Sequence, residues 1–367
     1  MASSQAPRDV RIRAADFVSD RNAIISLFAR NLPEWTDAHK AVQRYDWLYL
    51  SNPVGPARGW VAEDGQTGEV VGTSTGVPKR VRVSGRVEVA LNLTDFAIDH
   101  PYRSLGPALR LLRSTLEPVN ARQFAFAYEQ AVGGMLAPYT RLGVQPVASK
   151  SVHVRPLRVT PVVERLCGRS RMTRILGGVG DVTMAAAASV PRRRSRLPVH
   201  ALHGLCGEEF SMLDQQTAGM SSVRGVRSQD HLNWRMRRNP NHRHDILCAR
   251  IDDKLAGYVA SRMWSTQGHK VVVIVDLLTL NEPWITRQLL RHLAAVGRDR
   301  GAVAIAVRLL DDSPAVDVFR RLGFLTAPRW LKPERTHLVV YTPPGCSSLA
   351  TTLLTARNWW TFQGDHE

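Results

Sequence analysis

The sequence lacks paired cysteines and long apolar runs. Its four cysteines stand far apart, with no C-x-x-C spacing, so a zinc ribbon or a redox pair is not indicated. Scattered cysteines are typical of buried thiols in a reducing compartment. No stretch reaches the roughly 18 apolar residues of a membrane span, and the first residues contain no apolar signal-peptide core. We therefore expect a cytoplasmic protein with no membrane span and no bound metal.

Acidic residues are also scarce. The 49 Lys and Arg outnumber the 32 Asp and Glu, giving a net charge of +17 over 367 residues. Such a surface attracts anions, whether phosphate cofactors, acidic substrates, nucleic acid or an anionic membrane. The hydrophobic content of 44% is ordinary for a globular protein, and the length suggests two domains.

One short pattern occurs twice. "WLYLSNP" spans Trp47 to Pro53, and "WRMRRNP" spans Trp234 to Pro240, which is 187 positions later. Three further landmarks follow in the same order: "GEVVG" and "DKLAG", "LTDFAI" and "IVDLLTL", and "YTRLG" and "FRRLG". The offset between partners drifts only from 187 to 180. This collinearity indicates a tandem duplication, with a first domain at 1–159, a linker at 160–197 and a second domain at 198–367.

Each half shows the same order of elements. A strand and a helix are followed by a meander of strands with turn residues at the bends, which includes residues 69–85 in the first half. A strand at 89–98, apolar on both faces, precedes an amphipathic helix at 106–119, and a closing strand is expected at 149–159. The order predicts an α+β fold with a mixed, mostly antiparallel sheet in each half, flanked by helices and containing one βαβ crossover.

A glycine-containing turn joins the buried strand to the helix. Arg103, Gly106 and Ala108 form the pattern R-x-x-G-x-A, and a helix N-terminus behind such a turn favours an anion. The turn therefore predicts a pyrophosphate cradle. Pro107 fits a first helical turn but removes one N–H donor, so we expect weakened rather than lost binding. The second half has "NEPWITRQLL" here, without the glycine, which indicates that it lost this site.

The turn, the element order and the Y-x-x-L-G helix end resemble the GNAT acyltransferase superfamily, and the duplication resembles tandem GNAT proteins. The resemblance spans about Val10 to Thr342 and implies acetyl-CoA or another acyl-CoA as cofactor. It implies that Tyr139 protonates the departing thiolate, whereas Phe319 stands at that position in the second half. The positions that it implies for coenzyme binding are Phe96, Ala97, Ile98, Arg103, Ser104, Leu105, Gly106, Pro107 and Ala108.

An amine acceptor must lose a proton before it attacks a thioester, so a carboxylate or histidine should act as base. The candidates are Glu129, which ends the strand "FAFAYE", Glu88, Asp95 and His100. Asp95 has a counterpart in Asp276, which favours a structural role for both. We read the paired Trp47 and Trp234 as duplicated scaffold.

The predicted function is direct acyl transfer from acyl-CoA to an amine or hydroxyl of a small molecule or sugar, in the N-terminal domain. Two alternatives stay open. A Fem-type aminoacyl-tRNA-dependent transferase would use the positive charge, although nucleic acid is not favoured because such a donor needs no pyrophosphate turn. A non-catalytic scaffold would explain the missing second turn. The aromatic segment "NWWTFQGDHE" at the end is expected to fold back on the body.

Overall fold

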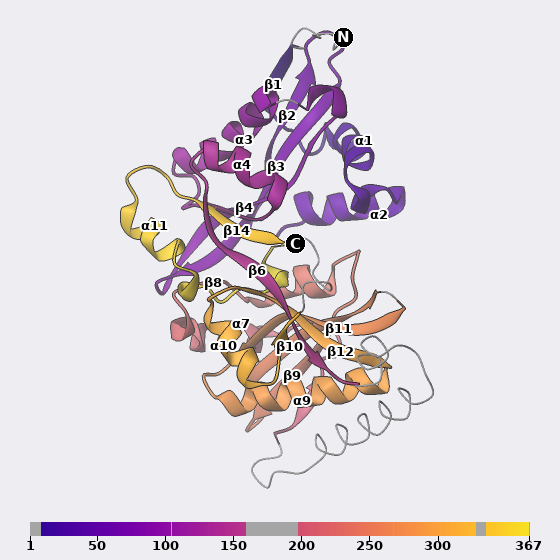
Figure 1. Cartoon of the computed structure of the whole chain (residues 1–367), viewed down its shortest axis with the longest axis vertical. Helices are drawn as coiled ribbons and strands as arrows, with labels where there is room; N and C mark the ends of the chain where they lie inside the picture. The colour runs from indigo at the N-terminus through magenta and orange to yellow at the C-terminus, as the bar shows by residue number, and fades with distance from the viewer. Residues whose placement is uncertain (1–8, 104, 159–196, 267, 328–334, 367) are drawn as a thin grey trace.

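The protein is described by a computed structural model that covers residues 9–103, 105–158, 197–266, 268–327 and 335–366 (Figure 1). Nearly all of the predicted linker lies outside these residues. The strands of the first half are β1 (Val10–Ala14), β2 (Arg58–Asp64), β3 (Val70–Val83), β4 (Arg86–Ile98), β5 (Ala127–Val132) and β6 (Gln145–Pro156). Its helices are α1 (Arg21–Asn31), α2 (Ala38–Tyr45), α3 (Leu105–Asn120) and α4 (Gly133–Arg141).

The second half repeats this order. Its strands are β7 (Val199–Ala201), β8 (Val223–Gly225), β9 (Asp245–Ile251), β10 (Lys254–Thr266), β11 (His269–Thr279), β12 (Ala302–Leu310), β13 (Leu325–Thr326) and β14 (Thr336–Tyr341). Its helices are α7 (Glu208–Gln216), α8 (Gln229–Leu232), α9 (Pro283–Asp299), α10 (Pro314–Arg321) and α11 (Ser347–Leu353). The predicted α+β architecture of two similar halves is confirmed.

The two halves exchange their closing strands. β6 of the first half pairs with β12 of the second, and β14 of the second half pairs with β5 of the first. β6 and β14 also pair with each other, so the 14 strands found in the described residues form one continuous sheet. Figure 1 shows the magenta β6 running down into the lower half while the yellow β14 lies among the upper strands. The sequence identified both closing strands, but it did not show that each completes the other half.

The duplicated tryptophans meet at the junction of the halves. The indole N–H of Trp47 donates to the carbonyl of Trp234 at 2.8 Å, and that of Trp234 donates to the carbonyl of Trp47 at 2.9 Å. Their rings stack with centroids 4.9 Å apart. Each is the second residue of its half's π-helical turn, at Asp46–Leu50 and Asn233–Arg237. This reciprocal contact is what a two-fold interface between identical subunits would make, and it supports the scaffold interpretation.

Val70–Val83 forms one long strand, β3, which passes through Gly72, Gly76 and Pro78. The predicted meander turns at Ser84 and Gly85, whose positive φ angles of 47° and 84° lead the chain into β4. A side chain at Gly76 would put its Cβ 2.8 Å from Leu91, so this glycine serves close packing rather than a turn. Pro78 lies between the stretch of β3 that pairs with β2 and the stretch that pairs with β8, where its missing N–H costs no ladder bond.

Helices cover both faces of the sheet in each half. In the first half, α1 and α2 pack on one aromatic-rich core, and α3 and α4 share a second cluster with β4 and β5. In the second half, α9 and α10 share one core, while α7 contributes to another. The segment after α11 folds back as predicted, with Trp359, Trp360 and Phe362 all buried. Within the described residues, no helix is both long and apolar enough to cross a membrane.

Candidate functional site

The central strands of the first half form a fork. β4 and β5 pair in parallel at Leu91 with Ala127 and at Asn92 with Tyr128, and then they part. The Asn92 amide donates to the Tyr128 carbonyl at 3.2 Å and holds the strands together where they begin to diverge. Beyond this point the strand pairing of Ala97 and Ile98 among the described residues is with β3 alone, so no described strand pairs with the edge of β4 that faces β5 there. Such an edge can bind an extended ligand through its backbone.

A β-bulge in β4 accompanies the fork. The register between β3 and β4 shifts after Thr73, and Asp95 adopts a positive φ of 46°, which is rare for a residue other than glycine. The Asp95 carboxylate accepts hydrogen bonds from the Tyr49 hydroxyl at 2.6 Å and from the Trp35 indole at 3.3 Å. Arg44 adds an ion pair at 3.3 Å. These partners fix the bulge and favour the structural role expected for Asp95.

Its counterpart in the second half is held in a similar way. Asp276 accepts a hydrogen bond from Tyr258 at 2.6 Å and an ion pair from Arg227 at 3.0 Å. The tyrosine comes from β10 here and from the π-helical turn in the first half. Both halves therefore anchor the central aspartate to a buried tyrosine and an arginine, although they do so with different elements.

The predicted pyrophosphate turn lies between β4 and α3. Helix α3 begins at Leu105, so Gly106, Pro107 and Ala108 occupy its first turn, while Ser104 lies outside the described residues. A Cβ added at Gly106 would meet no atom within 4 Å, so space is open beside the helix N-terminus. The free N–H groups of a first helical turn suit an anion at this place.

Arg103 lies in the loop between β4 and α3, where its guanidinium forms hydrogen bonds within the protein. Its guanidinium donates to the Ile98 carbonyl at 2.9 Å and to the Asn31 side chain at 2.8 Å. It thus ties the loop between β4 and α3 to the end of β4 and to α1. In this arrangement Arg103 shapes the turn, and the anion-binding groups would be backbone N–H groups.

Glu129 and Tyr139 meet beside the fork. The Tyr139 hydroxyl, from α4, donates a short hydrogen bond to the Glu129 carboxylate on β5. Burial raises the pKa of Glu129 to about 7, against the lowering effect of the Tyr139 hydrogen bond, and the nearby negative charge of Asp95 raises it further. Glu129 keeps some solvent exposure, whereas Tyr139 is buried. Burial and the adjacent carboxylate raise the pKa of Tyr139, so its hydroxyl is protonated at neutral pH.

The structure does not bring Glu88 or His100 to this pair. Glu88 lies seven residues before Asp95 on β4, which is about 23 Å along an extended strand. There it lines a pocket of about 250 Å³ with Arg122 and Cys346. His100 is exposed in the short turn after β4. Of the proposed bases, Glu129 is the one that contacts Tyr139.

The corresponding place in the second half is apolar. Phe319 of α10 replaces Tyr139 and is fully buried, and α9 starts at Pro283 without a glycine in its first turn. β11 and β12 also part beyond their parallel pairing. A segment of the same chain lies in this fork, where the Trp360 indole donates a hydrogen bond to the Leu277 carbonyl at 3.1 Å.

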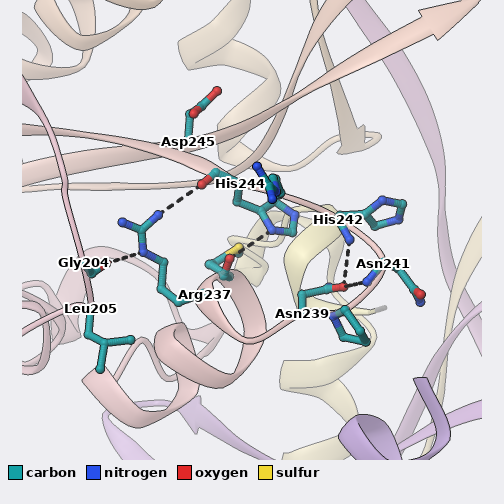
Figure 2. A pocket seen from close by; sticks show the side chains of 11 residues that line it. Gly204, Leu205, Arg237, Asn239, Asn241, His242, His244 and Asp245 are labelled. Atoms are coloured by element: carbon teal, nitrogen blue, oxygen red, sulfur yellow. Dashed lines mark hydrogen bonds between the residues drawn. The ribbon is translucent and has the colours of Figure 1, made fainter. Parts of the chain in front are cut away.

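A polar pocket of about 750 Å³, which sequence reasoning missed, opens on the second half (Figure 2). It follows the second W-x₄-N-P pattern. Arg237 lines it but donates to the carbonyls of Leu202, Gly204 and His244, so its guanidinium supports the loop. Burial lowers the pKa of His244 to about 4, so this histidine is neutral at pH 7. The run "NPNHRHD" was the signal in the sequence, but such runs are common in exposed loops.

Solved structures share this fold across almost the whole chain. A GCN5-related N-acetyltransferase from Anabaena variabilis aligns over 90% of this chain and 72% of its own, with a TM-score of 0.64 and 13% identity. N-myristoyltransferase from Saccharomyces cerevisiae, with bound myristoyl-CoA, aligns over 93% and 81%, with a TM-score of 0.56 and 12% identity. These likenesses define the class: the chain has the tandem GNAT fold.

A family model adds a match in sequence. The model described as "Acetyltransferase (GNAT) family" matches residues 211–324, so this part of the chain is similar in sequence to GNAT acetyltransferase domains. The resemblance drawn from the sequence motifs is thereby confirmed. No curated protein matches the chain by sequence. The matched range lies in the second half, although the glycine turn and the Glu129–Tyr139 pair lie in the first.

Proposed function

We propose that the protein is an acyl-CoA-dependent N- or O-acyltransferase whose reaction takes place in the first half. The GNAT-family match supports the enzyme class. The observation that carries the location is the contact between Glu129 and Tyr139 beside an unpaired edge of β4. We also propose that the chain divides into two domains, at 1–159 and 198–367, which exchange their closing strands.

The residues of the first half suit an acyl-CoA donor substrate. The edge of β4 at Phe96, Ala97 and Ile98 would bind the extended pantetheine arm, because β3 occupies only the opposite edge of Ala97 and Ile98. The start of α3 would receive the pyrophosphate on backbone N–H groups, and Gly106 leaves the space for it. The donor supplies the acyl thioester that the acceptor attacks.

Glu129 and Tyr139 would then move protons in opposite directions. With a pKa of about 7, Glu129 is partly ionised at neutral pH and can take a proton from an acceptor ammonium or hydroxyl. Tyr139 can give its proton to the departing sulfur and recover one from Glu129 through their hydrogen bond. A hydroxyl acceptor loses one proton and the thiolate gains one, so the pair ends in its starting state. An ammonium acceptor loses two protons on becoming an amide, and the second one leaves to solvent.

Calorimetric titration tests the location of the donor site. We expect acetyl-CoA or a longer acyl-CoA to bind at one site per chain, and we expect Gly106→Trp to abolish this binding by filling the open space at α3. Gly207→Trp is the matched control, because Gly207 also lies at a helix N-terminus and has no atom within 4 Å of an added Cβ.

Each other outcome has a definite meaning. Binding that survives Gly106→Trp would move the site to the second half, where the family match lies. Absence of binding with every acyl-CoA would contradict the proposal. Salt-dependent binding of aminoacyl-tRNA would then support the Fem-type alternative, and no binding of either donor would support a scaffold.

A further inference from the structure

The fork in the second half is occupied by a segment of the same chain. β11 and β12 pair from Lys270 to Ile274 and then part, as β4 and β5 do in the first half. The C-terminal segment, defined here as residues Trp359–His366, enters at this point. The Trp360 indole donates to the Leu277 carbonyl at 3.1 Å. By the offset of the repeat, Leu277 corresponds to Phe96, where the first half presents its free strand edge.

The segment also fits closely against β11. A Cβ at Gly364 would lie 3.0 Å from the carbonyl oxygen of Val275, and 2.9 Å from the end of Met236. Only a residue without a side chain allows the backbone to approach the strand this closely. The segment therefore lies against the same stretch of strand that an extended ligand would use.

Apolar contacts fill the space between β11 and α10. The ring of Phe362 lies 6.1 Å from that of Phe319, the residue at the position of Tyr139, and 5.6 Å from that of Trp360. Phe362 and Phe319 are completely buried, and both share a core with Leu277 and Leu309. The replacement of tyrosine by phenylalanine suits this apolar occupant.

Polar contacts from both halves hold the end of the segment. The Asp365 carboxylate pairs with Arg227 at 2.9 Å, and Arg227 also pairs with Asp276. The Asp365 carbonyl accepts from Tyr128 at 3.3 Å and from Lys79 at 3.4 Å, both of which belong to the first half. The segment thus links the fork of the second half to the strands of the first.

We propose that residues Trp360–His366 of this segment are a built-in ligand of the second fork, in the place that a coenzyme arm would take. The second half then serves as a docking site for the chain's own segment, and the chain has room for one acyl-CoA. The occupancy does not depend on the proposed function, whereas the single coenzyme site rests on it.

Hydrogen exchange of the full chain tests the occupancy. We expect Trp360→Ala and Phe362→Ala to speed amide exchange about ten-fold or more in residues 275–281 and 314–324, because the fork loses its filling. Trp359→Ala is the matched control. Trp359 packs in a different cluster and donates to the Leu353 carbonyl at 2.7 Å, so those two regions should keep their protection.

Unchanged exchange in both fork variants, or an equal effect of Trp359→Ala, would overturn the proposal. If the two fork variants do not fold, Gly364→Ala gives a milder form of the same test, since its Cβ would force the segment away from β11. Unchanged exchange in this variant would also overturn the proposal.

Titration with acetyl-CoA separates this inference from the proposed function. A second site in the wild-type chain would overturn the occupancy. No site at all would contradict the proposed function and leave the exchange result standing.

Discussion

The stacked pair of Trp47 and Trp234 allows a quantitative test of the junction between the halves. Trp47→Phe keeps an aromatic ring but removes the indole N–H that donates to the Trp234 carbonyl. That carbonyl then stays buried without this donor, which costs about 1–3 kcal/mol. The lost ring area adds to this, and we expect a loss of about 2–3 kcal/mol in the free energy of unfolding.

The reciprocal geometry gives a second expectation. Trp234→Phe removes the matching bond to the Trp47 carbonyl, so it should cost a similar amount, within about 1 kcal/mol. Trp47→Ala should cost about 5 kcal/mol, because the ring, its stacking and its hydrogen bond are all lost. Since the two rings touch, the Ala substitutions should not add, and a double-mutant cycle should give a coupling of about 0.5–1.5 kcal/mol.

Equilibrium urea unfolding measures these values, with Trp264→Phe as the control. Trp264 is 49% exposed, so its substitution should change the free energy of unfolding by less than about 0.5 kcal/mol. If Trp47→Phe is as mild as this control, or if only one of the two tryptophans matters, the reciprocal contact does not stabilise the junction and the reasoning fails.

Four further predictions follow from single contacts. Glu129→Gln should lower kcat about 10²–10⁴-fold and remove the rise of activity near pH 7, once an acceptor is known; an unchanged pH profile would rule Glu129 out as base. Because the folded-state pKa of Glu129 exceeds its ordinary value of 4.5, wild-type stability should fall as pH rises from about 4.5 to 7, and Gln should lessen this fall in urea unfolding at pH 5 and 8. Tyr139→Phe removes a hydrogen bond that lowers the pKa of Glu129, so the acid limb of kcat/KM should move to higher pH, and a shift to lower pH would refute the contact. Arg227→Met leaves the buried carboxylates of Asp276 and Asp365 without their shared cation and should cost about 3–5 kcal/mol, whereas Arg300→Met, in an exposed pair with Asp245, should cost less than about 1 kcal/mol.

Local patterns predicted the repeated order of elements well. The turn at Gly106 and the helix that follows it lie where the R-x-x-G-x-A motif placed them, since both depend on residues close together in the chain. Composition alone does not show that Gly76, a residue type common in turns, lies inside the strand β3. In the structure this glycine accommodates Leu91 on the neighbouring strand, a partner that the local sequence does not reveal.

The sequence suggested which residues belong to the candidate site, but it did not show how their side chains are arranged. Glu129 and Tyr139 were both named, but as separate candidates for base and acid. Their hydrogen bond depends on how α4 packs beside β5. Arg103 matched the motif, yet its guanidinium is engaged with Ile98 and Asn31, which lies 72 positions away. No spacing rule connects residues at that separation.

The sequence by itself determined that the fold occurs twice and that the first copy alone carries the glycine turn, because periodicity and short motifs depend on residues that are close together in the chain. Only the tertiary structure decided that β6 and β14 change places, that Trp47 and Trp234 form hydrogen bonds with each other, and that Trp360–His366 fill the second fork. Backbone pairing uses groups that every residue carries, so a strand's pattern shows that it will pair but not with which strand.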